Sequence, residues 1–290
     1  MVQESLRQVR RRILLGGVVA ATAGALLDSI PVARAQGAPL KVGVLPNVSA
    51  RVIFAQYQPV RAYLEAQLQQ AVEIQTAPDF KTFHARTRSG EYDVVVTAAN
   101  LGRLAQLDHQ WLPLAIYDPQ IPGVLVRIKG ASPGGPAALK GKRLALSNPQ
   151  SLVAMRGYAW LSEAGLRKDL DYTPILARND DSLGTLLSSP DTPYAIMSMG
   201  EFRSIPEGTR ANLEIETEFA RVPGFVVMHS PAMPAALAAR VTAAFLSLGD
   251  APQGKQFFDL SGFRAVRAPQ RVELESLDPF VAATRAALAP

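Results

Sequence analysis

Leu40-Lys41-Val42-Gly43-Val44-Leu45-Pro46 is the stretch from which the fold is predicted. It is a short apolar run that ends at a proline, which is typical of a buried β-strand. Apolar residues at helical spacing follow over 52–69, and an alternating strand pattern follows over 72–76. Strand, helix and strand in this order form the repeating unit of a parallel α/β sheet.

The same alternation continues along the chain, stops, and then starts again in a second block. The further elements that we expect are helix 80–89, strand 92–96, helix 99–107, strand 112–117, strand 143–146, helix 151–164, strand 172–176, helix 181–188, strand 194–197 and helices near 232–248, 252–260 and 271–288. Two series of strand–helix units predict an α/β protein with two doubly wound lobes.

Two similar segments border the second block. Residues 121–126 and 222–227 each place Pro-Gly ahead of an apolar β run. We interpret them as two chain crossings that form a two-strand hinge, although Pro-Gly before a strand is also a common turn. The expected organisation is a first lobe of 36–125 plus 224–290 and a second lobe of 126–223.

The N-terminal residues have the features of an export signal. Arg10-Arg11-Arg12 leads into an uncharged run from Ile13 to Leu27, and Ala33-Arg34-Ala35 provides an A-x-A cleavage site. The run is shorter than the roughly 20 residues that cross a bilayer. The paired arginines fit a twin-arginine signal. We therefore predict that residues 1–35 are removed and that the protein is periplasmic, with a retained membrane anchor as the alternative.

Charge and cysteine content exclude several classes of function. The formal net charge is +5, of which residues 1–35 contribute +3, so the mature chain carries only +2. This near-neutral charge gives no reason to expect a nucleic-acid partner. The chain has no cysteine, which excludes disulfides, thiolate nucleophiles and Cys-ligated metals.

The sequence contains no motif that supports catalysis or metal binding. Gly130-Ala131-Ser132-Pro133-Gly134 matches the G-x-S-x-G nucleophile elbow, but Pro133 lacks the backbone N–H that this motif uses in its oxyanion hole. His84, His109 and His229 are not at metal-ligand spacing. Phosphate-binding glycine motifs are missing. We expect no enzyme activity, no metal and no cofactor.

Small polar residues follow the C-terminal ends of the expected strands in both halves of the chain. They are Asn47, Ser49, Thr97, Asn100, Asn148, Ser151, Asn179, Asp180 and Ser198. Open α/β sheets bind ligands at this edge, where helix N-termini offer free N–H groups. Each residue taken alone is explained equally well as a helix cap. The set as a whole predicts a ligand cleft between the lobes.

Five short motifs in this order and spacing carry a family resemblance. They are residues 40–46, Ala77-Pro78-Asp79-Phe80, 90–96, 139–146 and Leu161-Ser162-Glu163-Ala164-Gly165. The chain resembles the periplasmic substrate-binding proteins of ABC transporters for phosphate, phosphite and phosphonate, which have the type II two-lobed fold. The resemblance implies that the protein captures a small anion and passes it to an ABC permease in the inner membrane.

The predicted binding loops differ from those of the family. Where members carry a Ser/Thr-rich loop, residues 148–153 keep a single hydroxyl, at Ser151. Asn179-Asp180 stands where members often carry a histidine, and Asn47 corresponds roughly to a family tyrosine. Tetrahedral oxyanions need several converging donors. Arg178, beside Asn179, and Arg51 are candidates to supply compensating positive charge, with a surface position as the alternative for both.

Two other functions remain open from the sequence. A sensory or accessory binding protein would have the same fold and would present its closed form to a membrane receptor instead of a permease. A cytoplasmic regulator shares this architecture as well, but the export signal and the lack of a helix-turn-helix pattern argue against it.

Overall fold

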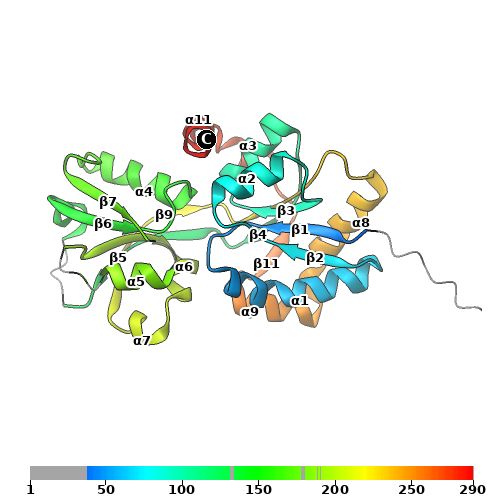
Figure 1. Cartoon of the computed structure of the whole chain (residues 1–290), viewed down its shortest axis with the longest axis horizontal. Helices are drawn as coiled ribbons and strands as arrows, with labels where there is room; N and C mark the ends of the chain where they lie inside the picture. The colour runs from blue at the N-terminus through cyan, green and yellow to red at the C-terminus, as the bar shows by residue number, and fades with distance from the viewer. Residues whose placement is uncertain (1–37, 131–133, 178–179, 188, 190, 290) are drawn as a thin grey trace, which may run out of the picture. The chain divides into compact units, whose positions relative to one another are not determined.

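The computed structural model of the chain describes residues 38–289, except 131–133, 178, 179, 188 and 190. The predicted signal segment and Ser132 of the G-x-S-x-G match lie outside the described residues. Within the unit Gln36–Pro290, the described strands form two sheets, each with helices on both faces (Figure 1). Two α/β lobes are therefore present, as the alternation of strand and helix patterns predicts.

The first sheet has the strand order β11-β4-β10-β3-β1-β2. β1 pairs in parallel with both β2 and β3, whereas β10 and β11 run antiparallel to their neighbours. The strands are β1 (Leu40–Val44), β2 (Val72–Gln75), β3 (Val94–Thr97), β4 (Leu112–Asp118), β10 (Val226–His229) and β11 (Ala265–Arg267). The helices of this lobe are α1 (Ala50–Leu68), α2 (Phe80–Arg88), α3 (Ala99–His109), α8 (Ala235–Leu246), α9 (Pro252–Ser261), α10 (Arg271–Glu275) and α11 (Asp278–Leu288).

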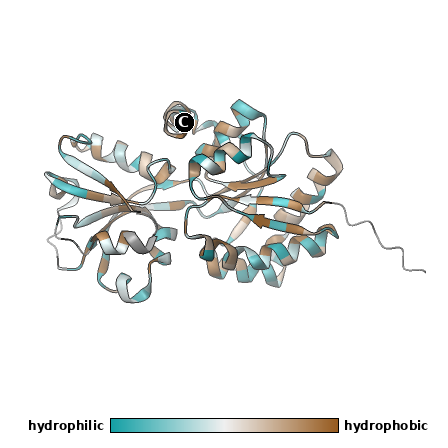
Figure 2. Ribbon diagram, in the orientation of Figure 1, coloured by the Kyte–Doolittle hydropathy of each residue, from teal (hydrophilic) through white to brown (hydrophobic). Residues whose placement is uncertain are grey.

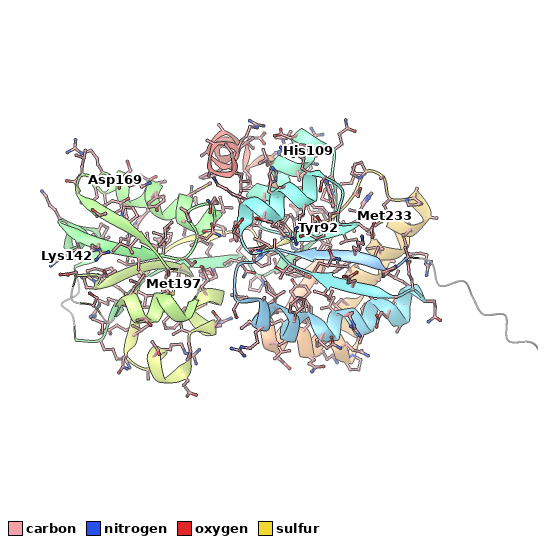
Figure 3. The ribbon with its side chains drawn as sticks, in the orientation of Figure 1. Tyr92, His109, Lys142, Asp169, Met197 and Met233 are labelled. Carbon is pink, nitrogen blue, oxygen red and sulfur yellow. The ribbon has the colours of Figure 1, made fainter. Side chains whose placement is uncertain are left out.

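β1 is an interior strand of the first sheet, between β3 and β2, and its sequence fits a strand that is covered on both faces. Val42 and Val44 are fully buried, and the strands of both sheets are among the most hydrophobic parts of the ribbon (Figure 2). Gly43 is required by packing, since a Cβ at this position would lie 2.7 Å from the ring of Tyr92. Tyr92, labelled in Figure 3, is itself only 1% exposed and packs against Phe83.

The second sheet has the order β7-β6-β8-β5-β9. β6 pairs in parallel with β7 and β8, while β5 is antiparallel to both β8 and β9. The strands are β5 (Ile121–Ile128), β6 (Lys142–Leu146), β7 (Tyr172–Leu176), β8 (Tyr194–Ser198) and β9 (Leu213–Val222), and the helices are α4 (Leu152–Glu163), α5 (Asp180–Leu187), α6 (Met199–Ser204) and α7 (Glu207–Arg210). Short 3₁₀ helices span Gly135–Leu139 and Leu248–Asp250.

The chain passes between the two sheets twice, next to each of the Pro-Gly segments that the sequence singles out. The first crossing lies between β4 and β5, and the second lies between β9 and β10. β5 belongs wholly to the second sheet, so the first crossing falls at 119–120, before the boundary expected after Leu125. The reason is that Ile121–Leu125 pair with β8 and β9 rather than with any strand of the first lobe.

Two further elements differ from the expectations. The single helix expected near 271–288 is wrong: α10 ends at Glu275 and α11 starts at Asp278. Pro279 in the first turn of α11 explains the break, because proline lacks the N–H that a continuous helix would need. The ten-residue β9 was not expected, although Leu213, Ile215 and Phe219 alternate with glutamates in the period-2 pattern typical of a strand.

The hydrophobic core continues from one lobe to the other on the side of α2, α3, α4 and α11. Leu45 and Ala99 of the first lobe belong to the same buried cluster as Leu152 and Val153 of the second. α11 packs on α2 and α3 (Figure 1). The Arg156 guanidinium of α4 lies over the ring of Phe280 on α11, with Cζ 5.6 Å from the ring centroid. This side of the cleft is therefore covered by α11.

Candidate binding site

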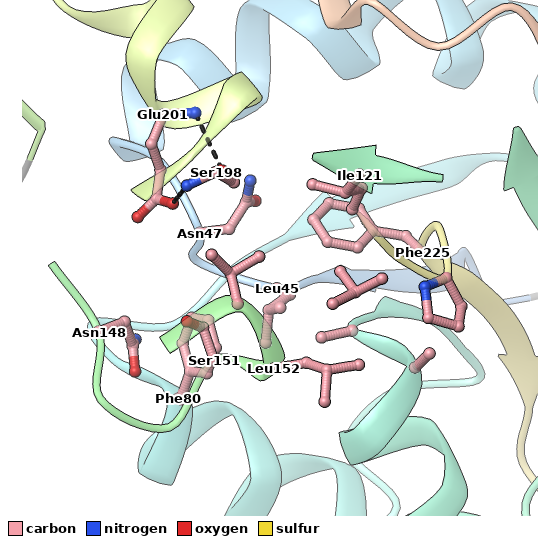
Figure 4. Close-up of a pocket in the computed structure, with 15 residues that line it drawn as sticks. Leu45, Asn47, Phe80, Ile121, Asn148, Ser151, Leu152, Ser198, Glu201 and Phe225 are labelled. Atoms are coloured by element: carbon pink, nitrogen blue, oxygen red, sulfur yellow. Dashed lines mark hydrogen bonds between the residues drawn. The ribbon is translucent and has the colours of Figure 1, made fainter. Parts of the chain in front are cut away.

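A small chamber lies between the lobes, at the C-terminal ends of β1, β3, β6 and β8 (Figure 4). Its volume is about 50 Å³, enough for a small group of atoms. We call it the inner chamber. It is lined by Leu45, Asn47, Phe80, Ala98, Ala99, Ile121, Asn148, Ser151, Leu152, Val153, Ser198, Glu201, Val222, Pro223 and Phe225. Both lobes and the second crossing contribute, so the chamber changes shape if the lobes move.

Four of the predicted site residues line the inner chamber: Asn47, Asn148, Ser151 and Ser198. Three of them are already bonded within the protein. Ser151 Oγ and Ser198 Oγ cap α4 and α6 by accepting backbone N–H groups at 3.1 Å, and Asn148 Oδ1 accepts the N–H of Gln150 at 3.0 Å. Among the described residues, the Asn47 side chain has no hydrogen-bond partner. Its amide is therefore free to meet a ligand.

Three other predicted residues lie outside this lining. Ser49 occupies the N-cap position of α1 without a side-chain cap bond. Thr97 and Asn100 are 2% and 1% exposed. Asn100 Nδ2 donates to Thr284 Oγ1 of α11 at 3.1 Å, and the buried Asn100 Oδ1 lacks a partner among the described residues. Asn100 thus joins α3 to α11, and its Nδ2 also donates to Gln150 O of the second lobe at 3.4 Å.

The remaining predicted residues follow β7. Arg178 and Asn179 lie outside the described residues. Asp180 is the first residue of α5, and only its backbone is described. Their part in a site therefore stays a prediction.

Glu201 is a lining residue that was not expected. It is 7% exposed; Ser147 Oγ donates to its Oε1, and the Ser198 N–H donates to its Oε2 at 2.6 Å. Burial raises the pKa of the Glu201 carboxyl, and the hydrogen bonds from Ser147 and Ser198 oppose this shift only in part. The sequence does contain the signal, because Ser198-x-x-Glu201 is a capping box at the start of α6.

We expect Glu201→Gln to remove part of the pH dependence of stability. Because the folded-state pKa of Glu201 lies above its ordinary value of 4.5, its contribution to stability is complete below that value and is lost as pH rises through the folded-state pKa. The thermal midpoint of the variant minus that of the wild type should therefore increase from pH 4 to pH 7, measured by circular dichroism.

Glu163→Gln is the matched control, since Glu163 is exposed at the end of α4. Its difference from the wild type should stay nearly constant over the same range. A Glu201→Gln difference that shrinks as pH rises would mean that the protein stabilises the charged form of Glu201.

A second, larger cavity of about 540 Å³ adjoins the inner chamber. We call it the outer chamber. The two share the lining residues Asn47, Ile121, Ser198 and Phe225. Helices α1 and α6, residues 260–261 at the end of α9 and residues 262–264 after it form further walls. Helices α1 and α9, which contribute to the outer chamber, lie on the opposite face of the molecule from α11 (Figure 1).

Arg203, Arg221 and Arg264 line the outer chamber, and no Asp or Glu is among its described lining residues. Arg221 pairs with Glu218 at 2.6 Å. Arg203 and Arg264 form no ion pair within the described part of the chain. Sequence spacing did not reveal this group, because Arg203 and Arg264 belong to different lobes.

The described residues include neither a candidate membrane-spanning helix nor a candidate metal cluster. No described helix combines the length and hydrophobicity that a bilayer crossing requires. The described His, Asp and Glu side chains form no cluster of three or more that could hold a metal ion. The rings of His84 and His109 do approach to 5.9 Å, and His109 lies at the end of α3 in Figure 3.

Comparison with protein families gives one match over most of the chain. A family model described as "ABC transporter, phosphonate, periplasmic substrate-binding protein" matches residues 42–273. No curated protein matches the chain.

Several solved structures share the fold. A binding-protein component of an ABC phosphonate transporter from Pseudomonas aeruginosa has a TM-score of 0.74 at 13% identity, covering 87% of this chain and 89% of that one. PhnD1 from Prochlorococcus marinus, in complex with methylphosphonate, has a TM-score of 0.74 at 15% identity, covering 84% and 97%. XAC2383 from Xanthomonas citri, bound to ATP, has a TM-score of 0.69 at 17% identity, covering 86% and 99%. At these identities the likeness shows the fold alone.

Proposed function

The chain belongs to the family of periplasmic substrate-binding proteins of phosphonate ABC transporters, and we propose that it binds a small phosphorus-containing anion between its two lobes and delivers it to a membrane permease. Members of this family are binding proteins and not enzymes. The observation that carries the proposal is a cleft whose inner and outer chambers take residues from both lobes, with guanidinium groups in the outer chamber.

The position of the cleft favours capture by lobe closure. The inner chamber includes Ile121, which begins β5 directly after the first crossing, Phe225 of the second crossing, and residues that follow strands of each sheet. A ligand that contacts both lobes stabilises their closed arrangement by the difference in its affinity for the closed and open states. A permease can then distinguish loaded from empty protein by the arrangement of the lobes.

The charge of the cleft favours an anion. Arg203 and Arg264 line the outer chamber without carboxylate partners in the described part of the chain. The N-termini of α3 and α4 border the inner chamber and add the positive ends of two helix dipoles. The ligands of two solved relatives, methylphosphonate and ATP, both carry phosphorus oxyanions, which supports this ligand class.

The cellular location follows from the N-terminal residues. We propose that Arg10-Arg11-Arg12 and the apolar run after it direct export by the twin-arginine route, and that cleavage follows Ala35. The family is periplasmic, which supports the same location.

Thermal unfolding against a ligand panel tests the function. The protein would be recovered from the periplasmic fraction of cells that express the full chain, and its mass would show whether residues 1–35 are removed. The panel contains phosphate, phosphite, alkylphosphonates, sulfate, carboxylates and amino acids. A phosphorus anion at about 100 times its Kd should add about 2.7 kcal/mol, which raises the midpoint by about 5–10 °C.

Sulfate at equal concentration and ionic strength is the control for general salt effects. A midpoint that rises only with amino acids or other non-phosphorus solutes would contradict the proposed ligand class. A midpoint that no member of the panel raises would contradict small-anion capture itself and would favour an accessory role.

A further inference from the structure

Helix α11 is fixed to the first lobe by two bidentate ion pairs with α3. Arg103 of α3 donates two N–H groups to Asp278, the first residue of α11, and the shorter N···O distance is 2.7 Å. Arg285, in the last turn of α11, donates in the same way to Asp108 of α3, also at 2.7 Å. Bidentate pairs fix the orientation of both partners. Because the two pairs lie at opposite ends of α11, this helix moves with the first lobe.

The contacts of α11 with the second lobe are weaker. The Arg156 guanidinium of α4 lies over the Phe280 ring, 5.6 Å from its centroid, and Thr284 Oγ1 lies 3.7 Å from Met155 Sδ. A cation–π contact of an exposed arginine contributes little free energy, and a thioether sulfur is a weak acceptor. These contacts can therefore break and form again while α11 stays in place on α3.

The contacts between α11 and α4 lie beside the inner chamber. The first residues of α3 and α4 line that chamber, and the residues that meet α11 follow within the next turn of each helix. Asn100 Nδ2 donates both to Thr284 Oγ1 of α11, at 3.1 Å, and to Gln150 O of the second lobe, at 3.4 Å. The contacts therefore require that the N-termini of α3 and α4 approach each other.

We propose that α11 is a latch between the lobes: the first lobe carries it, and its contact with α4 stabilises the arrangement in which the N-termini of α3 and α4 meet at the inner chamber. Met155, Arg156, Phe280 and Thr284 line neither chamber, so the latch acts without touching a ligand. The apparent Kd equals the intrinsic Kd divided by the fraction of protein in the binding-competent arrangement. The latch raises that fraction.

Two substitutions remove the cation–π contact from either side. Arg156→Ala removes the exposed guanidinium, and Phe280→Leu removes the ring but keeps an apolar side chain. Each should lower the ratio of latched to open protein about threefold, which is the effect of such a contact at an exposed site. The double variant should open no further than either single variant, because both substitutions remove the same contact. Arg156→Lys keeps a cation and should stay close to the wild type.

The distance between α4 and α11 reports the latch directly and needs no ligand. The chain has no cysteine, so cysteines introduced at the exposed residues Ser162 of α4 and Ala282 of α11 are the only sites for nitroxide labels. Pulsed electron spin resonance on the unliganded protein should show a larger long-distance population in Arg156→Ala and Phe280→Leu. Arg143→Ala is the control, since Arg143 is an exposed arginine of β6 that lines neither chamber.

Isothermal titration with methylphosphonate measures the consequence for binding. The Kd of each latch variant should rise in inverse proportion to its latched fraction, and the Kd of Arg143→Ala should equal that of the wild type. Labelled variants saturated with methylphosphonate should show the short distance of the wild type. Circular dichroism spectra and thermal midpoints close to those of the wild type would show that the variants are folded.

The outcomes separate this inference from the proposed function. Unchanged α4–α11 distances in both latch variants, or a larger latched fraction, would overturn the latch, although small-anion capture stands. A longer distance with an unchanged Kd would also overturn it, because the latched arrangement would then not be the binding-competent one. If methylphosphonate binds neither the wild type nor the variants, the proposed ligand class fails, and the distances measured without ligand still decide whether α11 is a latch.

Discussion

Replacing Gly224 by alanine should lower the thermal midpoint by about 6–12 °C. Gly224 lies in the second crossing, between β9 and β10, and a Cβ there would overlap the carbonyl oxygen of Tyr117. β4, which carries Tyr117, is held between β10 and β11, and the Tyr117 N–H also donates to Phe225 O at 2.9 Å. The carbonyl cannot move aside, so we expect an overpacking cost of about 3 kcal/mol, at about 2–4 °C per kcal/mol.

Gly208→Ala provides the control for Gly224→Ala. Gly208 lies in the short helix α7, and a Cβ there would meet no atom within 4 Å. Its midpoint should be unchanged or slightly higher, because alanine favours a helix by up to about 1 kcal/mol relative to glycine. Calorimetry on both variants checks this. A Gly224→Ala midpoint within 2 °C of the wild type would show that the crossing can rearrange freely.

The Gly224 variant should also bind its ligand more weakly. Pro223 and Phe225, on either side of Gly224, line the inner chamber. A shift of the crossing moves these side chains and changes how the lobes meet. Affinity should therefore fall in Gly224→Ala and stay at the wild-type level in Gly208→Ala.

Phe257→Ala should be still more destabilising, with a midpoint about 6–20 °C below that of the wild type. Phe257 of α9 is fully buried, and its ring centroid lies 5.2 Å from that of Tyr57 and 5.4 Å from that of Tyr117. Removing a buried phenyl ring costs about 3–5 kcal/mol through lost burial and the cavity that remains, again at about 2–4 °C per kcal/mol. Denaturant titration would give the free energy of unfolding directly.

Phe257→Leu is the matched variant for this site. It keeps an apolar side chain of similar volume, so its loss should stay below about 1.5 kcal/mol. Residues 260–264, at the end of α9 and directly after it, line the outer chamber. Because Phe257 packs this helix in place, Phe257→Ala should weaken ligand binding as well. Equal losses for the alanine and leucine variants would show that the aromatic contacts, and not the buried volume, stabilise this helix.

The two lobes, the positions of most strands along the chain and the approximate places of the two crossings could be predicted because they depend on local patterns. The apolar run at 40–45 and the alternation over 72–76 mark strands by their period, and both become paired strands of the first sheet. β9, which pairs with β5 alone along one edge of its sheet, was not predicted, although its sequence carries the period-2 signal: Leu213, Ile215 and Phe219 alternate with glutamates.

The candidate site was predicted in part for the same reason. The ends of β1, β6 and β8 place Asn47, Ser151 and Ser198 at the inner chamber, because the side chains that follow parallel strands meet at one edge. Asn100 follows the same rule by position, but it does not line the chamber: its Nδ2 donates to Thr284 Oγ1, 184 residues later in the chain, and to Gln150 O of the second lobe. Position after a strand does not determine which way a side chain points.

The sequence by itself determined the α/β architecture, the two crossings, the membership of a binding-protein family and the lack of cysteine chemistry. Only the tertiary structure decided which side chains face the cleft. It brings Arg203 and Arg264 to one cavity, buries Glu201 against Ser147, and uses Asn100 to hold α11. The physical reason is that secondary structure follows from the period of neighbouring residues, whereas a binding surface is assembled from residues far apart in the chain, whose distances the packing of two lobes sets.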